Sequence, residues 1–442
     1  MNSDKYRAID RKHHWHPYTK MSALEKNDIP IIERAEKEYL IDTEGVRYFD
    51  AISTWWANDL GHSRKDLLDE MHKQIDKLQH SITGNMSNIP VIKLSEKLAN
   101  LFEDNNRHVL YGSDGASAVE ASLKVALQYW SNLNRPEKCR FASLKNGYHG
   151  DTLGAVSVGF VEEFHKPFEK FVRPAYRADN PLCSKCEFGK SEDSCDAECF
   201  ISMENIFKEH GKTLAAVVLE PLCQGSAGMI IYSPKYLKKL EILCKKYEVL
   251  MIMDEIAVGY GRTGKMFAHQ HAGIDPDIVC VAKGLSTGYL PISAAIVKDE
   301  IYQTFSDIQT DNTFYHGHTH AGNPIACALA LKVLEVYENE NIVENSAKKG
   351  DILKYEFSKF LKLKSVDNIR TLGMIAVVEL VDGIMKNGIS APEYVKREML
   401  MRGIIIRPLG NVVYLMLPLV TNDKKIIEIT ATLYDAVSSL EN

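Results

Sequence analysis

The stretch VLMIMDEIAVGYGRTGKMFAHQHAGIDPDIVCVAKG, from Val249 to Gly284, contains two short apolar runs that each lead to a charged residue. The run VLMIM leads to Asp254, and the run DIVCVA leads to Lys283, 29 residues further along the chain. Short apolar runs bounded by polar or small residues are typical of strands buried in a parallel sheet. The stretch therefore predicts two buried strands whose carboxyl ends carry Asp254 and Lys283.

Similar apolar runs occur elsewhere in the chain and extend this predicted sheet. They are HVLYGSDGA from His108, CRFASLKNGYHGD from Cys139 and LAAVVLEP from Leu214. Between them, SAVEASLKVALQYWSNL and SPKYLKKLEILCKKYEV place apolar residues at three- and four-residue spacing, as amphipathic helices do. A repeated alternation of strand and helix predicts an α/β fold, with a mostly parallel sheet covered by helices on both faces.

The pattern changes after Asn323-Pro324, where long amphipathic helices are followed by the strand-like segments TLGMIAVVEL and GNVVYLMLPL. We therefore expect a large domain over residues 61–330 and a smaller α+β domain over residues 331–442. Residues 1–60 read as a short meander, which we expect to pack with the smaller domain.

Composition excludes several classes of protein. Of the 442 residues, 45% are hydrophobic and 25% are charged, which is the balance of a globular protein with a sizeable core. The formal net charge is −6 and no long basic run is present, so nucleic acid is not an expected partner. The polar start lacks an apolar signal core, and no run of about 18 apolar residues follows. We expect a cytoplasmic protein that does not bind a membrane.

Two groups of possible metal ligands stand out. Of the nine cysteines, four are clustered with a spacing that can hold zinc, although we favour free thiols; they are Cys183, Cys186, Cys195 and Cys199. His316, His318 and His320 alternate in FYHGHTHAGNP, which would place them on one face of an extended strand. We favour hydrogen bonding at a pocket mouth for these histidines and assign no metal ligand.

Asp254 and Lys283 call for a chemical explanation, because ligand sites of open α/β sheets lie at the carboxyl ends of strands. Asp254 alone could cap the following turn. Lysine, however, is almost never fully buried without a partner. An aldehyde cofactor explains both residues, since it reacts with an uncharged amine while a carboxylate keeps its pyridine nitrogen protonated.

A phosphate group would need its own anchor, and YGSDGASAVEASLK offers one where a strand meets a helix. The backbone amides of Gly115, Ala116 and Ser117 can point at an anion near the positive end of the helix dipole. An ordinary helix cap by Ser113 or Asp114 remains an alternative. In NGYHGD, Tyr148 could stack on a planar cofactor or could simply be buried in a loop.

Five motifs, in this order, resemble those of the class III (fold type I) aminotransferases: SDGASAVEASLK, NGYHGD, MDEIAVGYGRTGKMFA, VAKGLSTGYLP and GHTHAGNP. The resemblance covers roughly Trp15 to Pro418. It implies that pyridoxal 5'-phosphate is the cofactor, bound to Lys283, with Asp254 pairing with its pyridine nitrogen and Tyr148 covering its ring. It further implies a homodimer, in which the phosphate is bound by Gly115 and Ala116 together with His318 and Thr319 of a second subunit.

A second group of motifs resembles the subgroup that converts 8-amino-7-oxononanoate to 7,8-diaminononanoate in biotin biosynthesis: HHWHPYTKM, STWWANDLGH, ALQYW and GIIIRPLGNVVYLMLPL. The substrate would contact Tyr18, Trp55, Tyr148, Lys283, Gly317 and Arg407. We expect S-adenosylmethionine as the amino donor, because Tyr18 and Trp55 can stack on its adenine. Lysine as the donor, another ω-amino acid substrate, and a non-catalytic zinc-stabilised binding protein are the alternatives.

The motifs also depart from the family pattern. Ala116 stands where some relatives have serine, so that only its backbone amide can serve the phosphate. His318 stands where some relatives have proline. Arg407 could form a surface ion pair, but its planar guanidinium can also bind a substrate carboxylate through two parallel hydrogen bonds.

Overall fold

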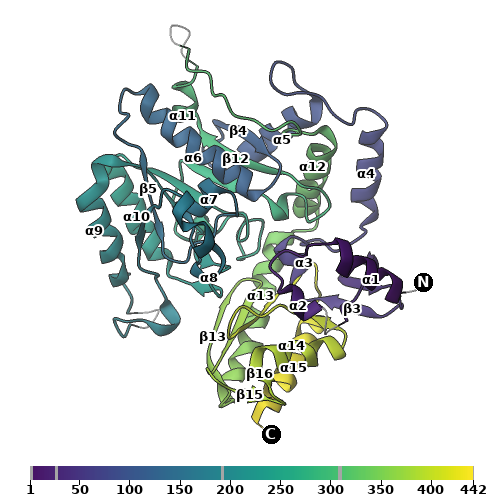
Figure 1. Ribbon diagram of the computed structural model, residues 1–442. Coiled ribbons are helices and arrows are strands. Elements are labelled where there is room, and N and C mark those ends of the chain that lie inside the picture. Colours follow the sequence, from purple (N-terminus) through teal and green to yellow (C-terminus); the bar gives the residue numbers. More distant parts are fainter. Residues whose placement is uncertain (1–2, 25–27, 191–193, 307–310, 442) are drawn as a thin grey trace.

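The computed structural model describes residues 3–24, 28–190, 194–306 and 311–441, and it has two lobes (Figure 1). The larger lobe is built on a seven-stranded sheet in the order β4-β12-β11-β10-β7-β5-β6. Its strands are β4 (Arg107–Gly112), β5 (Arg140–Leu144), β6 (Tyr176–Ala178), β7 (Leu214–Leu219), β10 (Leu250–Asp254), β11 (Ile278–Val281) and β12 (Ser293–Lys298).

The predicted α/β fold with a mostly parallel sheet is confirmed. All five apolar runs that we interpreted as strands form part of this sheet. Strand β10 pairs in parallel with β7 and β11, and β5 pairs in parallel with β7 and β6. Strand β12 was not anticipated, and it runs antiparallel to both of its neighbours, β11 and β4. Because β12 follows Lys283 by a short turn, it can only return along the sheet in the opposite direction.

Two helices predicted from their spacing cover opposite faces of this sheet. On one face, Val218 and Ile252 share a core with α6 (Gly115–Asn132). On the other face, Val217 and Met251, the preceding residues of the same strands, share a core with α10 (Pro234–Tyr247). Alternate residues of a strand point to opposite faces, so β7 and β10 are buried on both sides.

The smaller lobe combines both ends of the chain. In one sheet, β1 (Ile32–Glu36), β2 (Tyr39–Asp42) and β3 (Arg47–Asp50) are joined by β17 (Ile404–Ile405), which pairs in parallel with β3. A second sheet contains β13 (Val366–Leu372), β14 (Ile375–Leu380) and β18 (Val412–Met416). The N-terminal strands therefore share a sheet with a strand from the C-terminal part of the chain.

One expected strand is divided in two. We expected TLGMIAVVEL to form a single strand, but its first residues end β13 and the rest forms β14, with Gly373 in the turn between them. Gly373 has a φ of +53°, and a Cβ at this position would lie 2.4 Å from the backbone of Thr263. Only glycine can make so close a contact in this conformation.

Helices fill the remaining space around the two lobes. They are α1 (Ser3–His13), α2 (Met21–Leu24), α3 (Ser53–Trp56), α4 (Lys65–Ile75), α5 (Ile89–Ala99), α7 (Leu153–Val158), α8 (Glu162–His165), α9 (Ile201–His210), α11 (Asp299–Gln303), α12 (Pro324–Asn339), α13 (Ile342–Ser358), α14 (Ala391–Met401) and α15 (Asp423–Ser438). Within the described ranges, no helix combines the length and the apolar character that crossing a bilayer requires.

A buried ion pair connects the two lobes. The Arg262 side chain is 1% exposed, and one of its guanidinium nitrogens donates a short hydrogen bond to Asp59. Its Nη1 donates to the backbone carbonyl of Leu417, just beyond β18, at 2.5 Å. The Tyr337 hydroxyl of α12 donates to the other Asp59 oxygen at 2.9 Å. Both charges are thus paired and hydrogen-bonded, as buried charges must be.

We predict that Asp59→Ala lowers the free energy of unfolding by about 3–5 kcal/mol, because the Arg262 charge is left buried and unpaired. Denaturant unfolding followed by circular dichroism measures this loss. As a control, Asp69→Ala removes the exposed partner of Lys65 and should cost less than about 1 kcal/mol. Equal losses in the two variants would show that the Arg262 pair does not stabilise the fold in this way.

Candidate active site

The carboxyl ends of the strands open onto a hollow of about 680 Å³, which we call the large hollow. Asp254 ends β10 and Lys283 follows β11, and both lie in its wall, as the sequence predicted. Its lining also includes Gly115, Ala116 and Tyr148, together with Trp56, His149, Gly150, Asp151 and Glu220. Five of the residues proposed to bind the cofactor are thus brought together in one place.

Lys283 is held as an amine that readily loses its proton. Burial lowers the pKa of Lys283, and the negative charges of Asp254 and Glu220 only partly oppose this effect. Among the described residues, no carboxylate or carbonyl is hydrogen-bonded to its Nζ, which lies 4.8 Å from the centre of the Trp56 ring. Its φ of +35° is unusual for a residue with a side chain and marks a constrained backbone.

Asp254 is held in place by its neighbours. His149 Nδ1 lies 2.8 Å from Asp254 Oδ2, and the Ile256 amide donates to Oδ1 at 3.1 Å. Burial disfavours the charged imidazole, but the hydrogen bond to Asp254 and the charges of Asp254 and Glu220 raise the pKa of His149. These hydrogen bonds therefore hold the Asp254 carboxylate in one orientation in a buried site.

Glu220 is a site residue that the sequence interpretation missed. It follows β7 directly and accepts hydrogen bonds from the amides of Tyr148, at 3.0 Å, and Gly225, at 2.9 Å. Burial raises the pKa of Glu220 to about 7. The rule that identified Asp254, a carboxylate directly after a buried apolar run, also applies to Glu220 after LAAVVL.

The N-terminus of α6 forms one wall of the large hollow. Asp114 caps this helix by accepting hydrogen bonds from the amide of Ser117 at 2.9 Å and from its hydroxyl at 3.0 Å. The Ser117 amide is therefore already paired, and the expectation that it also points at an anion is wrong. Gly115 and Ala116 remain at the hollow, and a Cβ on Gly150 would lie 2.4 Å from the Ala116 side chain.

A second cavity of about 180 Å³, the small hollow, adjoins the first. Five of its lining residues are among those proposed to bind the substrate: Tyr18, Trp55, Tyr148, Lys283 and Arg407. Trp56, Tyr148 and Lys283 line both hollows, so the Lys283 amine lies where the two cavities meet.

Arg407 contributes an unpaired positive charge to the small hollow. It follows the short strand β17 in an irregular segment. Its guanidinium lies 4.2 Å from the centre of the Trp55 ring and 5.9 Å from that of Tyr18. No carboxylate of the described residues pairs with it, so the alternative of a surface ion pair does not hold.

Two tyrosines and a carboxylate meet beside the small hollow. The Tyr18 hydroxyl donates to Asp151 Oδ1 at 2.5 Å, and the Tyr148 hydroxyl donates to Oδ2 at 3.0 Å. Burial and the hydrogen bond to Asp151 raise the pKa of Tyr18 to about 12. Both phenols thus stay protonated at neutral pH, and they stand in fixed positions.

The two tryptophans come from a backbone segment of unusual conformation. Ser53, Thr54, Trp55 and Trp56 have φ values of +48°, +45°, +64° and +71°, which form a left-handed turn. For residues with a side chain this conformation costs roughly 1–2 kcal/mol per residue. Such a cost persists only where surrounding contacts enforce it.

Three predicted site residues lie elsewhere. Gly317, His318 and Thr319 are exposed and line neither hollow of this chain. The expectation of an extended strand with three histidines on one face is wrong, because residues 311–318 follow an irregular path. His316 Nδ1 instead lies 3.2 Å from the Lys124 amine of α6, and the His320 ring lies beside that of His80.

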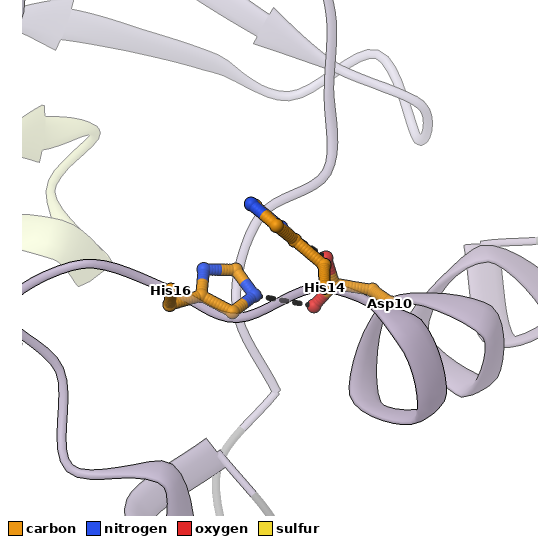
Figure 2. A group of neighbouring side chains, drawn as sticks. All are labelled: Asp10, His14 and His16. Carbon is orange, nitrogen blue, oxygen red and sulfur yellow. Dashed lines mark hydrogen bonds and ion pairs between the residues drawn. The ribbon is translucent and has the colours of Figure 1, made fainter.

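One trio of possible metal ligands lies close together within the described residues, and it is neither of those considered from the sequence. Ligand atoms of Asp10, His14 and His16 lie within 4.8 Å of one another (Figure 2). Hydrogen bonds explain this trio, since each Asp10 oxygen faces one imidazole, at 3.0 and 2.8 Å. The contacts fix the chain just before Tyr18.

The four clustered cysteines line a separate cavity of about 300 Å³.

These features fit an aldehyde cofactor that carries a phosphate. Lys283 supplies an amine with a lowered pKa, and Asp254 supplies a fixed negative charge in the same cavity. A phosphate can approach the first turn of α6 closely, because Gly115 has no side chain and a Cβ there would lie 2.9 Å from Ile256.

Comparison with known proteins agrees with this geometry. Residues 21–437 match the family model of the class III aminotransferases. Two curated relatives, from Geobacter sulfurreducens and Methanocaldococcus jannaschii, are named adenosylmethionine-8-amino-7-oxononanoate aminotransferase. Both are 38% identical to this chain; the alignments cover 95% of this chain and 94% of the first relative, and all of both chains for the second.

Solved structures give the same result. The crystal structure of the Methanocaldococcus jannaschii enzyme has a TM-score of 0.92 at 37% identity, over 99% of both chains. An (S)-enantioselective omega-transaminase from Thermomicrobium roseum has a TM-score of 0.93 at 29% identity, over 100% of this chain and 99% of the other. The chain therefore belongs to the class III aminotransferases, a family of pyridoxal-phosphate-dependent transaminases.

Proposed function

We propose that this aminotransferase converts 8-amino-7-oxononanoate to 7,8-diaminononanoate in biotin biosynthesis, with S-adenosylmethionine as the amino donor. The observation that carries the proposal is the unpaired Arg407 in an aromatic cavity that adjoins Lys283. The names of the relatives at 38% identity support the same substrate and the same donor.

The small hollow suits a long acid with one charged end. The guanidinium of Arg407 can bind a carboxylate with two parallel hydrogen bonds, and its stacking on Trp55 keeps it in one orientation. Trp55, Trp56 and Phe164 give the hollow apolar walls, against which a methylene chain can pack. A substrate bound to Arg407 therefore extends toward Lys283, where the two hollows meet.

Pyridoxal phosphate, when bound, supplies an aldehyde that reacts with amines and a protonated ring that withdraws electrons. Asp254 and His149 would face the ring nitrogen, and Gly115 and Ala116 would hold the phosphate through their amides. The Lys283 amine, with its lowered pKa, would take a proton from the donor carbon as general base and deliver it to the carbon of the former aldehyde as general acid. Asp151 accepts hydrogen bonds from the Tyr18 and Tyr148 hydroxyls and so holds both rings in place beside the small hollow.

The same site would serve two substrates in turn, so ping-pong kinetics are expected.

The rings of Tyr18 and Trp55 bear on the choice of amino donor. They meet edge to face at 84°, with centroids 5.6 Å apart, and do not form a parallel slot. An adenine can therefore stack on one ring while its edge faces the other. Lysine as the donor remains the second candidate, since it needs no aromatic partner.

We also propose that the active form is a homodimer. Gly317, His318 and Thr319 are exposed on a segment that includes Tyr315, which is 83% exposed. An exposed tyrosine of this kind is common in interfaces between subunits. From a second subunit, these residues would complete the phosphate and substrate sites of the first.

We predict that Lys283→Ala lowers kcat by at least about 10²- to 10⁴-fold, the usual contribution of a positioned acid–base group. The variant should still bind some cofactor, because the phosphate and ring contacts come from other residues. Borohydride treatment followed by mass spectrometry should attach the cofactor to the wild-type chain but not to the variant. Lys65→Ala, at an exposed lysine, should behave as wild type. Turnover at the wild-type rate in Lys283→Ala would refute the assignment.

A second prediction concerns the carboxylate. Arg407→Ala should weaken the use of 8-amino-7-oxononanoate by roughly 2–5 kcal/mol, the cost of removing one partner of a desolvated pair, and should affect the donor less. The kcat/KM of each half-reaction, measured separately, tests this. Arg402→Ala, at an exposed arginine of the same segment, is the matched control and should change neither value. Equal losses for the two substrates would make Arg407 a structural residue.

A third prediction separates the donors. S-adenosylmethionine alone should convert the enzyme-bound cofactor from its aldehyde to its amine form, since a base or adenine stacked on an aromatic ring gains roughly 1–3 kcal/mol. Absorbance spectra recorded after mixing the enzyme with each donor measure this conversion. Trp55→Ala should slow it for S-adenosylmethionine. If lysine converts the cofactor and S-adenosylmethionine does not, the assignment of the donor is wrong.

A further inference from the structure

The left-handed turn from Ser53 to Trp56 contains no glycine, although glycine alone adopts positive φ angles without cost. Both of its tryptophans line the small hollow, and they lie on adjacent residues. The Trp55 ring packs on Arg407 and the Trp56 ring faces the Lys283 amine at 4.8 Å. A turn of the ordinary hand would direct these side chains differently, so the conformation decides where both rings lie.

A buried carboxylate at the end of β3 holds this turn. Asp50 is 0% exposed and accepts hydrogen bonds from the Thr54 amide at 2.8 Å and from the Thr54 hydroxyl at 2.5 Å. His62 Nε2 lies 3.1 Å from the same oxygen that the hydroxyl contacts. Burial works against the charged form, but the hydrogen bonds from His62 and Thr54 hold the pKa of Asp50 below its usual value. Asp50 therefore remains a charged acceptor at neutral pH.

The two ends of the turn are fastened to the smaller lobe. The Ser53 hydroxyl donates to the Met416 carbonyl at 2.6 Å, and the Trp56 indole donates to the Tyr414 hydroxyl at 3.0 Å. Both partners belong to β18. These contacts fix the ends, whereas the contacts to Asp50 fix the middle, at Thr54, directly before Trp55. The orientation of Trp55 therefore depends most on Asp50.

We infer that Asp50, supported by His62, is a positioning residue for the substrate pocket: it enforces the left-handed turn and so places the Trp55 ring beneath Arg407. Asp50 itself lines neither hollow, so it acts through the backbone of Thr54 and not by touching a substrate. The inference rests on the proposed function only in naming the carboxylate-bearing keto acid as the ligand that this arrangement receives.

The test uses Asp50→Ala, the double variant Asp50→Ala/Thr54→Gly, and a control. In Asp50→Ala, KM for the keto acid should rise by roughly 10- to 100-fold, with a smaller change in kcat, because a misplacement of about 1 Å has effects of this size. Glycine at position 54 adopts the left-handed conformation freely, so the double variant should recover most of the loss. Near-UV circular dichroism without substrate, which reports on the tryptophans, should change in the single variant and return in the double variant.

Asp42→Ala is the matched control. Asp42 is also a buried aspartate in this sheet, 3% exposed, but it accepts hydrogen bonds from the amides of Glu44 and Val46, in the turn between β2 and β3, and none from the turn that carries the tryptophans. This variant should lose stability but keep the KM and the near-UV spectrum. An unchanged KM in Asp50→Ala, no recovery in the double variant, or the same KM rise in Asp42→Ala would each overturn the inference. If wild type fails to aminate the keto acid, the proposed function fails, while the near-UV comparison still decides the role of Asp50.

Discussion

The ion pair between Arg262 and Asp59 is the contact on which the geometry of the site most depends. It joins the segment after β10 to the N-terminal part of the chain, to α12 and to the end of β18. Two of these regions also supply walls of the large hollow, with Ile256 and Ala257 after β10 and Trp56 and Ala57 in the N-terminal part. Because the pair is buried, separating the lobes would expose two charges to a new environment at high cost, so the lobes remain in one arrangement. The buried ion pair, which is costly to desolvate, therefore lies where the relative position of the two lobes must be fixed.

The same low-dielectric interior sets the chemistry of the site. Burial lowers the pKa of Lys283 and raises that of Glu220, while His149, paired with Asp254, has its pKa raised. The removal of water causes the first two shifts, and their signs differ because one group is a cation and the other an anion when charged. The raised pKa of His149 comes instead from Asp254 and Glu220, against the effect of burial. The result is an amine ready to exchange protons in the same cavity as the hydrogen-bonded pair of Asp254 and His149. Groups with such opposed shifts in one cavity are typical of catalytic sites.

The sequence predicted the central sheet and the residues at its carboxyl edge, because apolar runs and the residues that follow them are local signals. Asp254, Lys283, Tyr148 and Gly115 could be placed in this way. Strand β12 and the turn at Gly373 were missed, since antiparallel return and a hairpin depend on which strands become neighbours. The helix cap by Asp114 could only be given as an alternative, because a helix cap and an anion site use the same amides. The Arg407–Trp55 contact joins residues 352 positions apart, and no local pattern records it.

The left-handed turn shows most clearly what a sequence pattern cannot report. STWW carries β-branched and aromatic side chains, which disfavour positive φ, so local propensity argues against the conformation that the chain adopts. Contacts with Met416 and Tyr414, far away in the chain, stabilise this conformation. The buried carboxylate of Asp50 stabilises it as well, by accepting a hydrogen bond from the Thr54 amide. Local rules are expected to fail where function requires strain, and the strain here lies directly at the small hollow, which Trp55 and Trp56 line. The failure of the local rules therefore points to the same cavity that the unusual surroundings of Arg407 indicate.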